Sequence, residues 1–212
     1  MNMTTSLTTF LRVFIIILAI GVAGYAVLYL RFEKMNLMYS KTDELLNNLL
    51  WKSMFYTHIT FGAIALAVGG FQFFPALRHK FINTHRKLGI IYVFSVLLSG
   101  LAGFYIAFFA STGTMASIGF GSLAVFWLYT NWKAYQSIKN KQVVVHQQFM
   151  VRNYALTLAA VTLRIYLGIF IGWQKIPFNE AYPFIAWGAW LPNLLVAEML
   201  IRFVPSSFKQ RL

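Results

Sequence analysis

The residues of this chain best suited to chemistry are its histidines and the arginines close to them. The chain has 212 residues, four His and no Cys. His85 and His146 each stand near the start of a long apolar run, followed by Arg86 and Arg152. Imidazoles from two facing helices can take both axial positions of haem iron, and arginines can pair with the haem propionates. The same residues can instead bind an anionic head group at a membrane surface.

Helical spacing puts polar residues of three apolar runs on single faces. Positions separated by 4, 7, 11 or 18 residues share a helical face, and polar residues in a membrane avoid lipid. The three faces comprise His58, Gly62, Ala65, Gly69 and Gln72; His85, Gly89, Tyr92, Ser99 and Gly103; and His146, Met150, Asn153, Thr157 and Arg164. We expect a cofactor or anion site of His85, Arg86, Tyr92, His146, Arg152 and Asn153, and a second polar site of His58, Gln72 and Arg164.

Two charged residues lie deep in apolar runs. Arg164 is about 18 Å beyond Arg152 at the helical rise, which predicts that it lines an outward-facing cavity, binds an anion, or bonds to helix-end carbonyls. Glu198 is the one acid within an apolar run and precedes Arg202 by four residues. That order favours a structural ion pair between Glu198 and Arg202.

Composition identifies the setting of these residues as a membrane. Hydrophobic residues make up 59% of the chain and charged residues only 11%, too little charge to cover a soluble domain of this length. The net charge of +13 is spread between long apolar runs rather than gathered on a soluble face, which argues against nucleic acid. The absence of cysteine excludes disulfides and thiolate metal sites.

The apolar runs predict an all-α bundle of six transmembrane helices in one domain, residues 1–212. The predicted spans are Thr8–Leu30, Ser53–Leu77, Leu88–Ala110, Met115–Ser137, Gln147–Trp173 and Tyr182–Val204. We expect spans two to five to form a four-helix core flanked by spans one and six. The connection "DELLNNLL" has leucines at helical spacing and predicts a short amphipathic helix at the outer interface.

Lysine and arginine predict the orientation. With the N-terminus inside, twelve of the eighteen basic residues lie inside, five lie outside, and Arg164 lies within a span. The inner set is Arg12, Arg78, Lys80, Arg86, Lys87, Lys133, Lys139, Lys141, Arg152, Arg202, Lys209 and Arg211, and the outer set is Arg31, Lys34, Lys41, Lys52 and Lys175. This predicts a cell (inner) membrane protein with both termini cytoplasmic.

Three stretches carry a family resemblance: "HITFGAIALAVGGFQF", "HRKLGIIY" and "HQQFMVRNYALTLAAVTLR". Together, over about residues 51–167, they resemble a mainly bacterial family of multi-helix membrane proteins, domain of unknown function number 2306. The resemblance implies a fold and a location but little chemistry. A looser similarity to the cytochrome b561 group implies haem held by histidine pairs; here the fourth span has no histidine, so at most one haem is implied.

Three functions are compatible with these residues. The first is a b-type haem protein for electron transfer, with His85 and His146 as the metal ligands. The second is a binding or transport protein without catalysis, with an inner His/Arg site for anionic lipid, or a groove for a lipid tail or quinone. The third is a zinc enzyme using His79, His85 and His146. The sequence leaves open whether the protein is an enzyme and what its oligomeric state is.

Overall fold

Every element of the described structure is a helix. The computed structural model describes residues 3–29 and 36–203. The elements are α1 (Met3–Leu28), η2 (Asn36–Ser40), α2 (Asp43–Asn47), α3 (Leu49–Phe71), α4 (Pro75–His79), α5 (Ile82–Ala107), α6 (Thr114–Lys139), α7 (Val143–Thr157), α8 (Ala159–Tyr166), η3 (Leu167–Trp173), α9 (Phe178–Gly188) and α10 (Leu191–Phe203). The all-α prediction is therefore confirmed. The predicted span ends at Leu30 and Val204, and the charges at Arg31, Lys34, Lys209 and Arg211, lie outside the described residues.

Five helical stretches of the described residues are long and apolar enough to cross a membrane. They are Phe10–Leu28, Leu49–Phe71, Ile82–Ala107, Val143–Trp173 and Phe178–Phe203. The remaining expected span, the fourth (Met115–Ser137), corresponds to α6, which has 26 residues and a length of about 39 Å at the helical rise. It is less apolar because it carries polar residues such as Thr130, Asn131 and Lys133.

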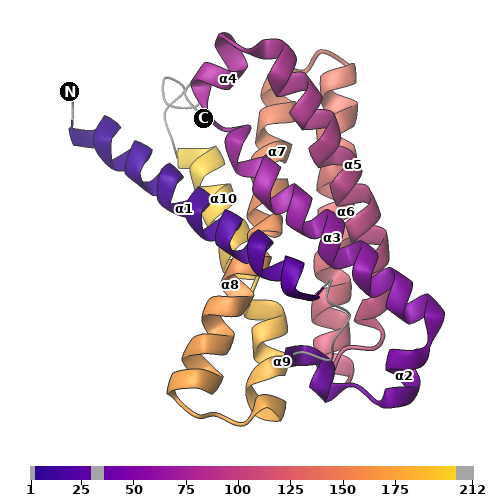
Figure 1. Cartoon of the computed structure of the whole chain (residues 1–212). Helices are drawn as coiled ribbons and strands as arrows, with labels where there is room; N and C mark the ends of the chain where they lie inside the picture. Colours follow the sequence, from indigo (N-terminus) through magenta and orange to yellow (C-terminus); the bar gives the residue numbers. More distant parts are fainter. Residues whose placement is uncertain (1–2, 30–35, 204–212) are drawn as a thin grey trace.

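The helices α3, α5, α6 and α7 pack against one another and make up the centre of the bundle. Helix α1 runs obliquely across α3 and also touches α8, α9 packs on α6, and α10 packs on α7 (Figure 1). The contact of α1 with α3 and α8 uses Ala19, Ala23, Leu66 and Val161. Small residues let helix backbones approach closely where lipid gives no hydrophobic driving force, which explains why alanines lie at this contact.

The bundle has two ends that carry different residues. We call the end formed by α4, the start of α5 and the start of α7 the α4 end, at the top of Figure 1. The opposite end, with α2 and the start of α9, is the α2 end. Pro75 opens α4 at its first turn, where a missing N–H costs nothing, so the chain turns back after α3 and enters α5.

The predicted amphipathic helix is shorter than the leucine pattern suggested. Helix α2 ends at Asn47, and Leu49 and Leu50 belong to α3. The Asn48 side chain accepts a hydrogen bond from the Trp51 backbone N–H at 3.0 Å. Asparagine is a strong N-cap, so this contact starts a new helix in a new direction and separates the two leucine pairs.

The fifth predicted span is built from three consecutive pieces. Helix α7 passes at Leu158 into α8, which passes into the π-helical segment η3. Together they cover Val143–Trp173, four residues more at the start than the predicted span. Segment η3 contains Gly168 and Gly172, and glycine readily accommodates departures from the regular α-helix. Arg164 lies in the last turn before this change of helix type.

Candidate functional site

A cavity of about 280 Å³ lies in the half of the bundle near the α2 end. Its walls come from α1, α3, α5, α6, α7, α8 and α9, and most of the residues are Ala, Gly, Leu or Ile. Three basic side chains also line it: Lys41, His58 and Arg164. The described residues that line the cavity include no acid. The space is therefore apolar along its walls and basic at its polar positions.

His58 is held in one orientation on α3. Its Nδ1 lies 2.9 Å from the Ser99 carbonyl oxygen, and Ser99 Oγ donates to the His58 carbonyl at 2.8 Å. A methyl group placed on Gly103 would lie only 2.8 Å from Nδ1, so the imidazole packs directly on that glycine. Because a carbonyl only accepts, Nδ1 carries the proton, and in the neutral ring Nε2 is an acceptor. Ser99 and Gly103 of the polar face predicted for α5 thus hold the His58 ring in place.

Arg164 reaches the cavity wall from α8. Its Nη1 donates to the Ala160 carbonyl at 2.7 Å, and its guanidinium carbon lies 5.5 Å from the centre of the Tyr25 ring. Its Nε is buried and, among the described residues, has no hydrogen-bond partner. Its electrostatic neighbours in the described chain are tyrosines and His58, and none is an acid. Arg164 therefore lines a cavity and bonds to a carbonyl of its own helix, while an outward-facing cavity and anion binding stay predictions.

Lys41 is a cavity residue that sequence reasoning missed. The sequence predicts only an outer loop charge, but the Lys41 side chain is half-buried in the cavity wall and its Nζ donates to the Phe109 carbonyl oxygen. Burial lowers the pKa of Lys41 from 10.5 to about 8. Tyr29 and Tyr182 also line the cavity and were not singled out. No local pattern marks these three residues, because they meet only where α1, α9 and the α2 end converge.

Tyr92 and Asn153 belong to a saturated hydrogen-bond network between α5, α6 and α7. Tyr92 Oη donates to Asn153 Oδ1 at 2.6 Å and lies 2.8 Å from Thr157 Oγ1. Asn153 Nδ2 donates to the Trp127 carbonyl and to Thr130 Oγ1, each at 2.8 Å. Tyr92 and Asn153 are fully buried. Their polar groups are thus committed to partners within the bundle, and Thr157 joins this network to the cavity wall.

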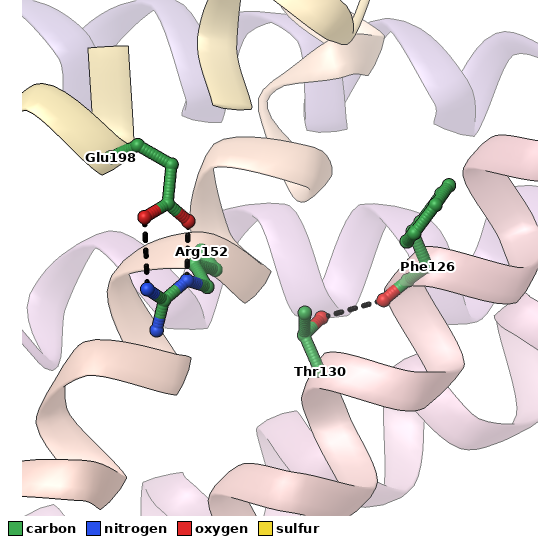
Figure 2. Close-up of polar contacts among 4 residues, drawn as sticks. All are labelled: Phe126, Thr130, Arg152 and Glu198. Carbon is green, nitrogen blue, oxygen red and sulfur yellow. Dashed lines mark hydrogen bonds and ion pairs between the residues drawn. The ribbon is translucent and has the colours of Figure 1, made fainter. Parts of the chain in front are cut away.

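Thr130 shows how α6 accommodates this network. Its hydroxyl donates to the Phe126 carbonyl of its own helix at 2.8 Å (Figure 2). The oxygen then accepts from Asn153, so the buried threonine and asparagine satisfy each other. A polar pair of this kind is stable inside a membrane bundle because no group is left without a partner.

Glu198 forms the predicted structural ion pair, but its partner is Arg152 rather than Arg202. Arg152 Nε and Nη2 donate to the two carboxylate oxygens of Glu198 at 2.5 and 2.9 Å (Figure 2). The planar guanidinium and the carboxylate match in a two-bond fork, and α10 packs on α7 at this point. Arg152 is therefore bound to Glu198 of the neighbouring helix α10. Arg86, the other arginine of the predicted site, is exposed.

His85 and His146 lie within electrostatic range of each other at the α4 end. His146 Nδ1 donates to the Ala134 carbonyl of α6 at 2.8 Å, while His85 Nδ1 is buried and has no partner among the described residues. Seven residues further along each helix, the 2.6 Å bond from Tyr92 to Asn153 closes the space between α5 and α7. That bond lies about 10 Å along the helices from the histidines, and haem held by this pair stays a prediction.

The zinc hypothesis lacks its ligand set. Within residues 3–29 and 36–203, no group of three or more His, Cys, Asp or Glu is arranged to hold a metal ion. His79 is exposed at the end of α4. The three histidines proposed as ligands are therefore not gathered into one site.

Gln72 is not part of the site that contains His58 and Arg164. It caps the far end of α3, fourteen residues and about 21 Å along the helix from His58. A methyl group placed on Gly89 would lie 3.9 Å from Gln72 Oε1, so Gln72 neighbours the α5 face that begins with His85. His58 and Gln72 do lie on the same face of α3, as predicted. A helical face runs from one end of the bundle to the other, so two residues on it need not belong to one site.

Comparisons with known proteins agree with this membrane fold. Residues 55–201 match the family model "Predicted membrane protein (DUF2306)". The chain is also 37% identical over 68 residues to the dolichol phosphate-mannose biosynthesis regulatory protein of Mus musculus, covering 29% of this chain and 81% of the mouse protein. The Rattus norvegicus protein matches with the same values. No solved structure matches. The similarity to the cytochrome b561 group stays a prediction. The family match covers more than half of the chain, so this protein belongs to the DUF2306 family of predicted membrane proteins.

Proposed function

We propose that this multi-pass membrane protein binds an amphiphilic molecule with an anionic head group, such as a lipid phosphate, in the cavity near the α2 end. The observation that carries the proposal is the composition of the cavity: apolar walls, three basic side chains and no acid among the described lining residues. An apolar pocket with a few converging polar groups is the usual form of a small-molecule site. The volume of about 280 Å³ suits a head group and the first carbons of a chain.

A phosphate monoester offers partners for each polar side chain in the cavity. Its oxygens accept from the guanidinium of Arg164 and the ammonium of Lys41, and its hydroxyl donates to Nε2 of His58. Arg164 Nε has no partner within the described chain, so a ligand oxygen would satisfy a buried donor. The mammalian relatives are named for regulation of dolichol phosphate-mannose biosynthesis, and that name concerns a lipid phosphate. This likeness covers 29% of the chain, so the proposal depends on the cavity.

The proposal includes a topology. We infer six spans, with α6 as the fourth, because α6 lies between α5 and α7 and turns Thr130 and Asn131 inward. Both termini would then lie on one side, and the excess of lysine and arginine at the α4 end favours the cytoplasm. Single cysteines at Lys139 and Lys175, both exposed and at opposite ends of the bundle, provide the test: an impermeant thiol reagent added from the cytoplasmic side should label the first and leave the second unlabelled. Labelling of Lys139→Cys from the opposite side would contradict this orientation.

The binding test uses the full chain in nanodiscs of phosphatidylcholine doped with phosphatidic acid or with diacylglycerol of the same chains. After transfer to detergent, native mass spectrometry should show retained phosphatidic acid and much less diacylglycerol. Arg164→Leu should lose the lipid retained in the cavity, whereas Arg202→Leu, which removes an exposed arginine of α10, should keep it. Equal retention of the two lipids, or unchanged retention in Arg164→Leu, would remove the basis of the proposed function.

A further inference from the structure

A second group of polar atoms without partners lies at the α4 end, far from the cavity. Gln72 is 5% exposed, yet neither its Oε1 nor its Nε2 has a hydrogen-bond partner in the described part of the chain. The same holds for His85 Nδ1 and for Nε and Nη2 of Arg78. Buried polar atoms are nearly always hydrogen-bonded, so five unpartnered atoms on three side chains point to something that binds them.

These three side chains come from three consecutive elements that converge. Gln72 ends α3 and lies against Gly89 of α5, and His85 is one turn before Gly89 on the same helical face. Arg78 on α4 lies within electrostatic range of His85, and α4 packs on α5. The short helix α4 therefore brings Arg78 close to the junction between the end of α3 and the face of α5 that carries His85.

The electrostatic surroundings of this group are positive. Arg78 is also within range of Arg12 on α1, and burial together with the Arg12 charge lowers the pKa of Arg78. The acid of α10 near this end, Glu198, is already bound in a fork by Arg152. The neighbours of His85 and Arg78 in the described residues are basic, so an anion would be attracted and a cation repelled.

We propose that Gln72, Arg78 and His85 form a phosphate-binding site at the α4 end. Nε and Nη2 of an arginine present the parallel donors that fit two oxygens of one phosphate. The amide nitrogen of Gln72 donates to a third oxygen, and the amide oxygen accepts from a protonated phosphate oxygen. A carboxylate has no such hydroxyl and would leave Oε1 without a partner, so the mixed donor and acceptor set favours phosphate. The source is a phospholipid head group or free phosphate.

This inference is independent of the proposed lipid site. The two lie about 21 Å apart along α3, and the described residues at the two sites are different. Loss of Arg164 should abolish lipid retention in the cavity and leave the α4-end site intact. Loss of Arg78 should have the opposite effect.

The test measures the melting temperature of the full chain in detergent with sodium phosphate or sodium acetate at equal ionic strength and pH, and in phosphatidylcholine nanodiscs with or without phosphatidic acid. Ligand that binds only the folded state raises the melting temperature. We expect a rise with phosphate or phosphatidic acid and none with acetate. A rise with phosphatidic acid alone that persists in Arg164→Leu identifies a lipid head group at the α4 end, and a rise with both ligands identifies a general phosphate site.

The variants decide whether the named residues carry the effect. Gln72→Leu should melt higher than the wild type without phosphate, because it removes an unsatisfied buried amide, and should lose the phosphate-dependent rise. Arg78→Lys keeps the charge but loses the two parallel donors, so the variant should bind phosphate at least about fivefold more weakly. This variant also tests the site if Gln72→Leu does not fold. Lys87→Ala, an exposed charge on the same end of α5, should behave as wild type. A phosphate-dependent rise that survives in both Gln72→Leu and Arg78→Lys, or no rise in any arm, overturns the proposal.

Discussion

The hydrogen-bond network around Asn153 and the cavity beside it differ in how fully their polar groups are partnered. In the network, Tyr92, Thr130 and Asn153 satisfy one another across three helices and are shielded from solvent. In the cavity, Arg164 keeps a buried donor without a partner in the described chain, and His58 uses one ring nitrogen for the Ser99 carbonyl. Thr157 borders both. Polar residues inside a membrane bundle therefore have two roles. Those whose polar atoms are all hydrogen-bonded hold the helices together, and those with an unpartnered buried atom are available to a ligand.

The largest effect should come from breaking the network. Asn153→Leu removes hydrogen bonds to Tyr92, Thr130 and the Trp127 carbonyl and leaves buried groups unpaired, so we expect a loss of about 3 kcal/mol in the free energy of unfolding. Denaturant titration in mixed micelles gives this value. Asn140→Ala, an exposed residue at the end of α6, is the control and should change stability little. A loss in Asn153→Leu no larger than in the control would show that the network does not stabilise the bundle.

Removing the cavity arginine should weaken lipid binding without lowering stability. Arg164→Leu deletes a partly buried charge with an unpartnered nitrogen, so the folded state should be as stable as wild type or more stable. Affinity for a lipid phosphate should fall about tenfold, equivalent to about 1.4 kcal/mol. A titration of phosphatidic acid followed by tryptophan fluorescence measures the affinity. A strongly destabilised Arg164→Leu variant with unchanged lipid affinity would show that Arg164 stabilises the fold and does not bind the lipid.

The ion pair between α7 and α10 should rank next. Arg152 and Glu198 are 21% and 31% exposed, so their fork is partly solvated. We expect a coupling energy of about 1 kcal/mol in a double-mutant cycle of Arg152→Gln and Glu198→Gln, smaller than the network and without effect on lipid affinity. A coupling near zero would mean that the packing of α10 on α7 holds this contact.

The smallest effect concerns pH and Lys41. Since its pKa in the folded protein is about 8, Lys41 is charged below that pH and neutral above it. Affinity for the anionic lipid should therefore fall about threefold between pH 7 and pH 9, which isothermal titration measures. The unfolded chain keeps this proton until near pH 10.5, so the stability of the lipid-free protein should rise over the same interval. Lys41→Arg stays charged, and its affinity should not change with pH; an identical decline in that variant would assign the effect to another group.

Much of the fold follows from the apolar runs, and some of the site follows from the helical faces. Tyr92 and Asn153 were expected on facing interior surfaces, and they bond there. His58 and Arg164 were grouped as one site, and they line one cavity. Residue spacing within one helix gives no information about partners across helices. It therefore assigned Glu198 to Arg202, where the bundle uses Arg152, and placed Gln72 with His58 although a helix length separates them.

The sequence by itself determined the all-helical membrane class and which faces turn inward, because burial of apolar groups and avoidance of polar groups in lipid act residue by residue along each helix. Tertiary structure alone decided which polar groups meet. Lys41, Tyr29 and Tyr182 reach the cavity only because α1, α9 and the α2 end close around it. Hydrogen bonds act over about 3 Å, and the rotation and depth of one helix against the next set such distances; the spacing of residues within a helix does not.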